Sequence, residues 1–252
     1  MAAEGSNSID ALGQFQLHPA LGPIGASVNF TQSNLMMVVA GVLILGLLWI
    51  GMKPRAMVPG RLQATAELGY DFIMSMCIDT IGPEGRKFFP FVFTLFFFIL
   101  FGNVLGVFPL FFTFTSHIMV TLALTLLVFI LSTVVAFREH GLHFFSYFLP
   151  QGIPIALSPL LVVIEVISYF SRIISLSVRL FANMMAGHVM LEVFGAFIIM
   201  LGGFGLLGYL PAALTLGLNT ILIGFELLVA VLQAYVFAIL TCIYLHDAVH
   251  LH

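Results

Sequence analysis

Charged side chains are scarce in this sequence. Asp, Glu, Lys and Arg make up 8% of its 252 residues, whereas hydrophobic residues make up 61%. A soluble domain carries about 25% charged residues, because its surface has to face water. The composition therefore excludes a soluble domain and predicts an integral membrane protein. The net charge of −3 says nothing about partners, and no nucleic acid is expected among them.

Cysteine is also nearly absent. Cys77 and Cys242 form no CxxC motif, so we expect them to pack among apolar side chains rather than to form a disulfide or bind a metal. No metal site and no cofactor are expected. The N-terminal residues lack the basic segment and apolar core of a signal peptide, and residues 1–34 are predicted to be a short extramembrane segment.

Long apolar runs make up most of the remaining chain. A helix needs about 20 apolar residues to cross about 30 Å of hydrocarbon. The predicted spans are residues 35–52, 88–109, 118–137, 160–207 and 212–244, within a single polytopic domain of residues 35–252. Residues 62–85 mix acidic and apolar side chains and predict an amphipathic helix at the interface. The predicted fold class is therefore an all-α integral membrane protein, with the Phe-rich second span facing lipid.

Basic residues beside the apolar runs predict an orientation. Lys53 and Arg55 follow the first span, Lys87 precedes the second and Arg138 follows the third. Cytoplasmic loops carry an excess of Lys and Arg. We therefore expect the N-terminus in the periplasm and, after the remaining crossings, the C-terminus in the cytoplasm.

The last two runs are too long for one perpendicular crossing each. No proline occurs from Leu160 to Leu210, and a helix of that length would reach on the order of 75 Å. The chain either turns back at one of the glycines between Gly202 and Gly208, or it forms a very long helix that is steeply tilted. Hydropathy alone does not choose between these possibilities.

Charged residues are rare in the C-terminal part. Between residues 141 and 246 they are Glu165, Arg172, Arg179, Glu192 and Glu226. At about 100° per residue, six polar residues share one helical face, each within about 40° of the direction of Arg179. They are Glu165, Ser168, Arg172, Ser175, Arg179 and Asn183. An arginine at membrane depth costs roughly 2.5–3.5 kcal/mol on insertion scales and marks an ion path or a partner's counter-charge. Arg179 is therefore the leading candidate for function.

Further polar residues lie outside that face. His188 and Glu192 point to the opposite side of the same helix, and Asn219, Glu226 and Gln233 recur every seven residues in the last run. Asparagine and glutamine often join helices by hydrogen bonds, and for them this alternative stays open. The ionisable residues instead favour a water-filled cavity or a proton relay. Glu226 with His188 or Glu192 would suit proton hand-off if helix packing brings them together.

Two sequence runs carry a family resemblance. SVRLFANMMAGH, followed by FELLVAVLQAYVFAILTCIYL, resembles subunit a of F-type ATP synthases, and the likeness covers the chain well from Phe101 to Tyr244. It implies an N-terminal span, an amphipathic helix and four further helices, the last two long and steeply inclined against a ring of c subunits. The resemblance thereby favours a long, steeply tilted helix over a turn at the glycines between Gly202 and Gly208. His188 and Glu226 exchange the acid and the imidazole of the bacterial prototype, as mitochondrial members do.

The same resemblance implies roles for the polar residues. Arg179 would face the carboxylate of the rotating c-ring and separate two aqueous half-channels. The outer half-channel, or its junction with the rotor, would use Glu226, His188, Asn183, Asn219 and Gln233. The cytoplasmic half-channel would use Glu165, with Ser168 or Arg172 nearby. Ser175 and Glu192 complete the expected proton path.

The resemblance also implies partners and a location. The expected partners are the c-ring, b-type peripheral stalk subunits and, indirectly, the catalytic F1 sector, within a lipid bilayer. The chain would conduct protons for ATP synthesis without being an enzyme by itself. A bacterial inner membrane is expected, with the mitochondrial inner membrane as the alternative.

Two other function classes compete with this one. A secondary transporter could use Arg179 for an anionic substrate, but such proteins typically have inverted repeats and broken helices, and neither is visible in the sequence. A haem-binding respiratory subunit would need paired intramembrane histidines, and only His117 and His188 fall near membrane depth. The transporter remains the alternative to a proton-conducting subunit.

Overall fold

The computed structural model describes residues 31–52, 60–108, 112–141, 158–205 and 208–250, and their regular structure is helical. The elements are α2 (Gln32–Met52), α3 (Arg61–Ile81), α4 (Gly85–Val107), η2 (Phe114–Ser116), α5 (Ile118–His140), α6 (Ser158–Gly202) and α7 (Tyr209–Val249). Among them, α2, α4, α5, α6 and α7 are long and apolar enough to cross a membrane. The predicted all-α membrane fold is confirmed.

Local chemistry explains where some helices end. α5 continues three residues past the apolar run that ends at residue 137, through Arg138 to His140. Basic side chains interact favourably with the carbonyl groups at a helix C-terminus. The helix then stops at Gly141, whose φ of 55° is readily adopted by glycine. The break between α3 and α4 likewise falls at Gly82, with a φ of 94°.

The two longest helices answer the question about the last apolar runs. α6 has 45 residues and α7 has 41, which correspond to about 67 and 61 Å. The chain turns between them, where Gly205 has a φ of 70°, so it contains both very long helices and a turn at glycine. Helices about twice as long as the hydrocarbon layer is thick are more than long enough to cross it, and a tilt relative to the bilayer normal would accommodate the excess length.

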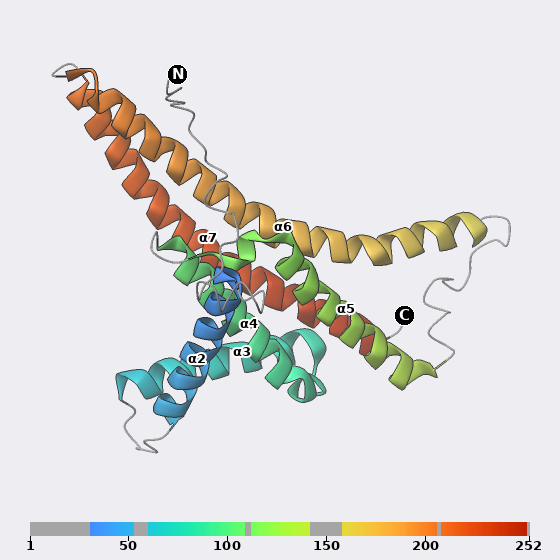
Figure 1. Cartoon of the computed structure of the whole chain (residues 1–252). Helices are drawn as coiled ribbons and strands as arrows, with labels where there is room; N and C mark the ends of the chain where they lie inside the picture. Colours follow the sequence, from blue (N-terminus) through green and yellow to red (C-terminus); the bar gives the residue numbers. More distant parts are fainter. Residues whose placement is uncertain (1–30, 53–59, 109–111, 142–157, 206–207, 251–252) are drawn as a thin grey trace.

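α6 and α7 form a long antiparallel pair. In Figure 1, α7 is nearly straight, whereas α6 curves, and the later part of α6 runs beside the first part of α7. The earlier part of α6 packs near α5. Pro211 does not interrupt α7, because it lies in the first turn, where a missing N–H group has no helical acceptor.

The apolar core lies where α4 packs against α3 and α7. Val92, Phe96 and Ile99 of α4 are buried there, together with Ile73 of α3 and Phe237 of α7. The prediction that the Phe-rich span faces lipid is therefore wrong for much of its surface. Aromatic side chains pack into a continuous cluster along α4, because they bury more area against protein neighbours than small residues do.

α3 covers this core from one side as an amphipathic helix. It buries Ile73 and Cys77 and exposes Glu67 and Asp71. Cys77 and Cys242 of α7 are both free thiols with no exposed surface, and their Sγ atoms lie 3.8 Å apart. The expected packing role of the two cysteines is confirmed.

Candidate functional site

An acid and an imidazole lie together between α6 and α7. Nε2 of His188 is 3.8 Å from Oε1 of Glu226, and the two side chains are 13% and 6% exposed. The sequence left open whether helix packing joins these residues. The structure joins them in a largely shielded contact between the two long helices.

Gly187 allows this close approach. A Cβ atom at position 187 would lie 2.7 Å from Oε1 of Glu226 and 3.0 Å from its Cδ, which is closer than van der Waals contact permits. Because glycine has no side chain, the Glu226 carboxyl group reaches the surface of α6 beside His188.

Thr113 contacts the same imidazole from the connection before α5. Its Oγ1 lies 2.7 Å from Nε2 of His188, a distance typical of a strong hydrogen bond. Thr113 immediately precedes η2 and is buried. The site therefore combines side chains from α6, α7 and the turn that contains η2.

Asn103 of α4 links this turn to α7. Oγ1 of Thr115 donates to Oδ1 of Asn103 at 2.8 Å, and Nδ2 of Asn103 donates to the carbonyl oxygen of Ala230 at 3.3 Å. Asn103 and Thr115 have no exposed surface. Since Ala230 lies one helical turn after Glu226, these bonds fix the turn relative to the part of α7 that carries the acid.

Polar atoms along α7 lack hydrogen-bond partners among the described residues. They are both carboxyl oxygens of Glu226, Nε2 of Gln233 and Oδ1 of Asn219. A buried polar group without a protein partner is normally hydrogen-bonded to an ordered water. The seven-residue spacing therefore gives α7 a row of groups suited to binding water.

Arg179 lies on the exposed surface of α6. Ser175, Ala182 and Ala186 are exposed around it, and these small side chains leave room for another helix to approach. Within the described part of the chain, no carboxylate forms an ion pair with Arg179. An exposed permanent cation on an apolar helix marks this face of α6 as a candidate site for a partner's counter-charge.

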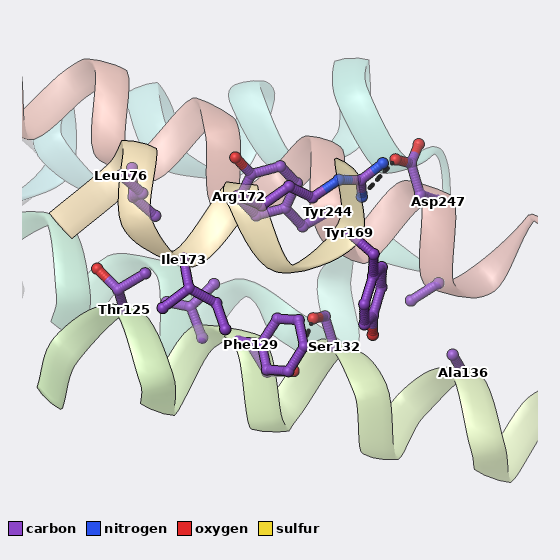
Figure 2. Close-up of a pocket in the computed structure, with 12 residues that line it drawn as sticks. Thr125, Phe129, Ser132, Ala136, Tyr169, Arg172, Ile173, Leu176, Tyr244 and Asp247 are labelled. Atoms are coloured by element: carbon purple, nitrogen blue, oxygen red, sulfur yellow. Dashed lines mark hydrogen bonds and ion pairs between the residues drawn. The ribbon is translucent and has the colours of Figure 1, made fainter. Parts of the chain in front are cut away.

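Arg172 shares a helical face with Arg179, but its charge is compensated. Its Nη1 donates to Oδ2 of Asp247 at 3.1 Å, and its guanidinium carbon lies 5.2 Å from the ring centroid of Tyr244 and 5.9 Å from that of Tyr169. Figure 2 shows these side chains around a cavity between α5, α6 and α7. The cavity measures about 30 Å³, which is room for on the order of two waters.

The remaining predicted residues surround these groups on α6. Glu165 is partly buried and Ser168 is exposed, on the N-terminal side of Arg172. Asn183 and Glu192 are partly buried, one turn after Arg179 and His188 respectively. The hydrogen bonds and ion pairs above join His188 to Glu226 and Thr113, and they do not include Glu165 or Ser168.

Comparison with known families identifies the chain's relationship. A sequence model of the family described as ATP synthase A chain matches residues 34–246. The chain belongs to the ATP synthase A chain family. Proteins named ATP synthase subunit a from Granulibacter bethesdensis and Gluconacetobacter diazotrophicus are 64% and 63% identical to it. The first alignment covers 100% of both chains, and the second covers 96% of this chain and 98% of the relative.

Membership of this family confirms the resemblance drawn from the sequence motifs. A third relative, ATP synthase subunit a from Acidiphilium cryptum, is 57% identical over 98% of both chains. With bacterial relatives and five helices that can cross a membrane, the chain is a multi-pass protein of a bacterial inner membrane.

Sequence reasoning missed several residues of this site. Asp247 lies one residue beyond the segment in which charges were compared, although an intramembrane arginine such as Arg172 usually has a partner acid. Thr113 and Thr115 carry no periodic signal, because they lie in a turn between two apolar runs. The role of Gly187 beside Glu226 depends on a contact between α6 and α7 that no sequence pattern shows.

Proposed function

We propose that this chain is the proton-conducting stator subunit of an ATP synthase. It loads and unloads the carboxylates of a rotating c-ring through two aqueous half-channels, which Arg179 keeps apart. The observation that carries the proposal is the shielded contact between His188 and Glu226 across α6 and α7. The name ATP synthase subunit a, carried by its relatives, supports the same role.

The outer half-channel follows α7. Asn219 and Gln233 bind water on either side of Glu226, and Asn183 and Glu192 contribute polar groups from α6. At 3.8 Å, His188 and Glu226 are slightly beyond direct hydrogen-bond distance. A small ring movement or one bridging water then passes a proton from the imidazolium Nε2–H to the carboxylate oxygen, and this transfer leaves two neutral groups.

Arg179 separates the step that loads a proton onto the rotor carboxylate from the step that releases it. A carboxylate on the rotor crosses lipid as a neutral acid, because an ionised group at that depth is costly. The fixed guanidinium favours the ionised carboxylate as it passes, so the proton has to leave before the rotor site moves on. Arginine cannot deprotonate under these conditions, and its permanent charge also repels protons that would leak directly between the half-channels.

The cytoplasmic half-channel runs near the first part of α6. Glu165 accepts the released proton, with the hydroxyl groups of Ser168 and Ser175 beside the path. The ion pair between Arg172 and Asp247 supports this arrangement, because a second uncompensated cation would oppose proton exit. Each proton that crosses the membrane supplies about 2.3 kcal/mol per 100 mV of potential.

The partners follow from these roles. The c-ring packs against the exposed face of α6 around Arg179, b-type subunits hold the chain still, and the F1 sector uses the resulting rotation. The chain itself catalyses no reaction. Its N-terminus lies in the periplasm and its C-terminus in the cytoplasm.

The test measures passive proton conduction in vesicles that carry the assembled membrane sector without F1. Glu226→Gln removes the acid and should slow conduction by about tenfold or more. Exchange of the two residues, His188→Glu with Glu226→His, should be milder than loss of either one. Glu139→Gln, at the exposed end of α5, is the matched control.

Two results would count against the proposal. One is full conduction by the Glu226→Gln variant. The other is an exchange variant as damaged as the single losses, which would argue against a functional pair. A transporter of anionic solutes would instead move its substrate without the c-ring.

A further inference from the structure

A buried turn brings a hydroxyl group to His188, and α4 is shaped to receive that turn. A Cβ atom at Gly102 would collide with the Phe114 ring, and one at Gly106 would collide with the Thr113 side chain. Thr113 and Phe114 are 5% and 1% exposed. The two glycines, one helical turn apart, therefore form the groove in which this turn sits.

The hydrogen bonds of the turn direct the Thr113 hydroxyl to the imidazole. Oγ of Ser116 donates to the carbonyl oxygen of Thr113 at 2.6 Å, which closes the turn without using the threonine hydroxyl. That hydroxyl lies 2.7 Å from Nε2 of His188. The same Nε2 faces Oε1 of Glu226 at 3.8 Å, so a hydroxyl and a carboxyl group share one ring nitrogen.

A hydroxyl group suits this position because it can both donate and accept. When His188 is neutral with its proton on Nδ1, Thr113 donates to Nε2. When the ring is charged, Nε2–H donates to Thr113. The ring therefore keeps one hydrogen bond in both charge states, and its orientation toward Glu226 does not depend on the proton that it carries.

We propose that Thr113 is a positioning residue for proton transfer between His188 and Glu226. Its hydroxyl holds the imidazole in place before and after the transfer. During the transfer Nε2–H gives up its hydrogen bond to Thr113, the N–H bond breaks as the O–H bond forms at Glu226, and the Thr113 hydroxyl then turns to donate to the freed Nε2. This inference rests on the proposed function and adds a residue from outside the two long helices. The bonds from Thr115 through Asn103 to Ala230 keep the turn in register with Glu226.

The test compares two substitutions at one position in the assembled membrane sector. Thr113→Val keeps the shape and removes the hydroxyl group, whereas Thr113→Ser keeps the hydroxyl group. We expect passive proton conduction to fall about tenfold in the valine variant, as befits loss of one hydrogen bond to a charged ring. The serine variant should stay within about twofold of the unchanged chain.

Two control variants are needed. One tests whether loss of any buried hydroxyl group slows conduction, and the other tests whether His188 itself is required. Thr241→Val removes a buried hydroxyl that donates to the Phe237 carbonyl oxygen of its own helix, and it should conduct normally. His188→Ala should be at least as slow as the Thr113→Val variant. If the valine variant does not assemble, Thr113→Ala replaces it, with the serine variant again expected to conduct.

A spectroscopic measurement gives a second readout. In complexes labelled with ¹⁵N-histidine, the His188 ring signals should shift in the valine variant and return in the serine variant. Normal conduction by the valine variant while His188→Ala is slow would overturn the role of Thr113 alone. Equal damage in the valine and serine variants would mean that packing, not the hydroxyl group, matters. Full conduction by His188→Ala would instead refute the proposed role of His188.

Discussion

Gly187 determines how closely Glu226 can approach α6. The atoms that a Cβ at this position would meet are Oε1, Cδ and Cγ of Glu226, at 2.7, 3.0 and 3.2 Å. These atoms belong to the end of a flexible side chain, so the carboxyl group can move away at small cost to the fold. The expected consequence of filling position 187 is therefore a displaced acid rather than an unfolded protein.

The first prediction tests that consequence. Gly187→Ala should slow passive proton conduction by about tenfold, because Glu226 loses its place beside His188. The complex should still assemble, since alanine favours the helix by up to about 1 kcal/mol over glycine.

Gly195→Ala is the matched control. It makes the same change on the same helix at a position where a Cβ meets no atom within 4 Å. The two variants should assemble to the same level, as measured by the amount of subunit recovered in the complex. Equal conduction in both would disprove the steric role of Gly187.

At the scale of elements, the ion pair of Arg172 and Asp247 ties the end of α7 to α6. The two side chains are 24% and 25% exposed, and the guanidinium also lies near the Tyr169 and Tyr244 rings. A partly shielded pair with aromatic neighbours contributes more than an exposed one. It also avoids most of the desolvation cost that a fully buried pair carries.

The second prediction is a double-mutant cycle on this pair. With Arg172→Gln, Asp247→Asn and the double variant, the free energy of unfolding in detergent should show a coupling of about 1 kcal/mol. Lys87 and Glu84 provide the comparison, because their side chains are 68% and 47% exposed at 3.7 Å. Their coupling should be close to zero, and the same value for both pairs would contradict a stabilising contact between α6 and α7.

The elements also show what the sequence could predict. Composition predicts the membrane class, because lipid excludes charged residues from most of the chain. The helical period predicts the amphipathic helix and the polar face of α6, because residues on one face recur every three or four positions. The burial of α4 does not follow. A Phe-rich run is equally suited to lipid and to a protein core, so hydropathy cannot tell them apart.

The site was predictable in the same partial way. Glu226, His188 and Arg179 stand out because ionisable groups are costly in lipid. Thr113, Thr115 and the glycines of α4 depend on contacts between segments distant in sequence, and no local pattern encodes them.

At the scale of the whole molecule, the ends of the helices should lie on alternate sides of the membrane. The proposed orientation puts the turn between α6 and α7 in the periplasm and the end of α5 in the cytoplasm. Phe204 is 70% exposed in that turn, and Glu139 is exposed at the end of α5. Both positions are suitable for chemical labelling.

The third prediction concerns labelling of introduced cysteines, which is possible because the two native thiols are buried and should not react. A membrane-impermeant maleimide should label Phe204→Cys from the periplasmic side and Glu139→Cys only in inverted vesicles. The unchanged chain should give no signal, because Cys77 and Cys242 have no exposed surface. Labelling from the opposite sides would reverse the orientation, and with it the assignment of the two half-channels.

The central claim is that Arg179 is the divider between the half-channels. Its charge is exposed on α6 and has no acid partner among the described residues, so the rotor carboxylate is its proposed counter-charge. Removal of that charge should uncouple proton flow from rotation without disturbing the packing of the chain. Arg138→Ala, at the exposed end of α5, removes an arginine without touching this face.

The most direct measurement is ATP synthesis driven by a proton gradient in vesicles that carry the complete complex. Arg179→Ala should abolish synthesis while the complex assembles in normal amounts, and Arg138→Ala should leave both unchanged. Full synthesis by an assembled Arg179→Ala complex would contradict the account.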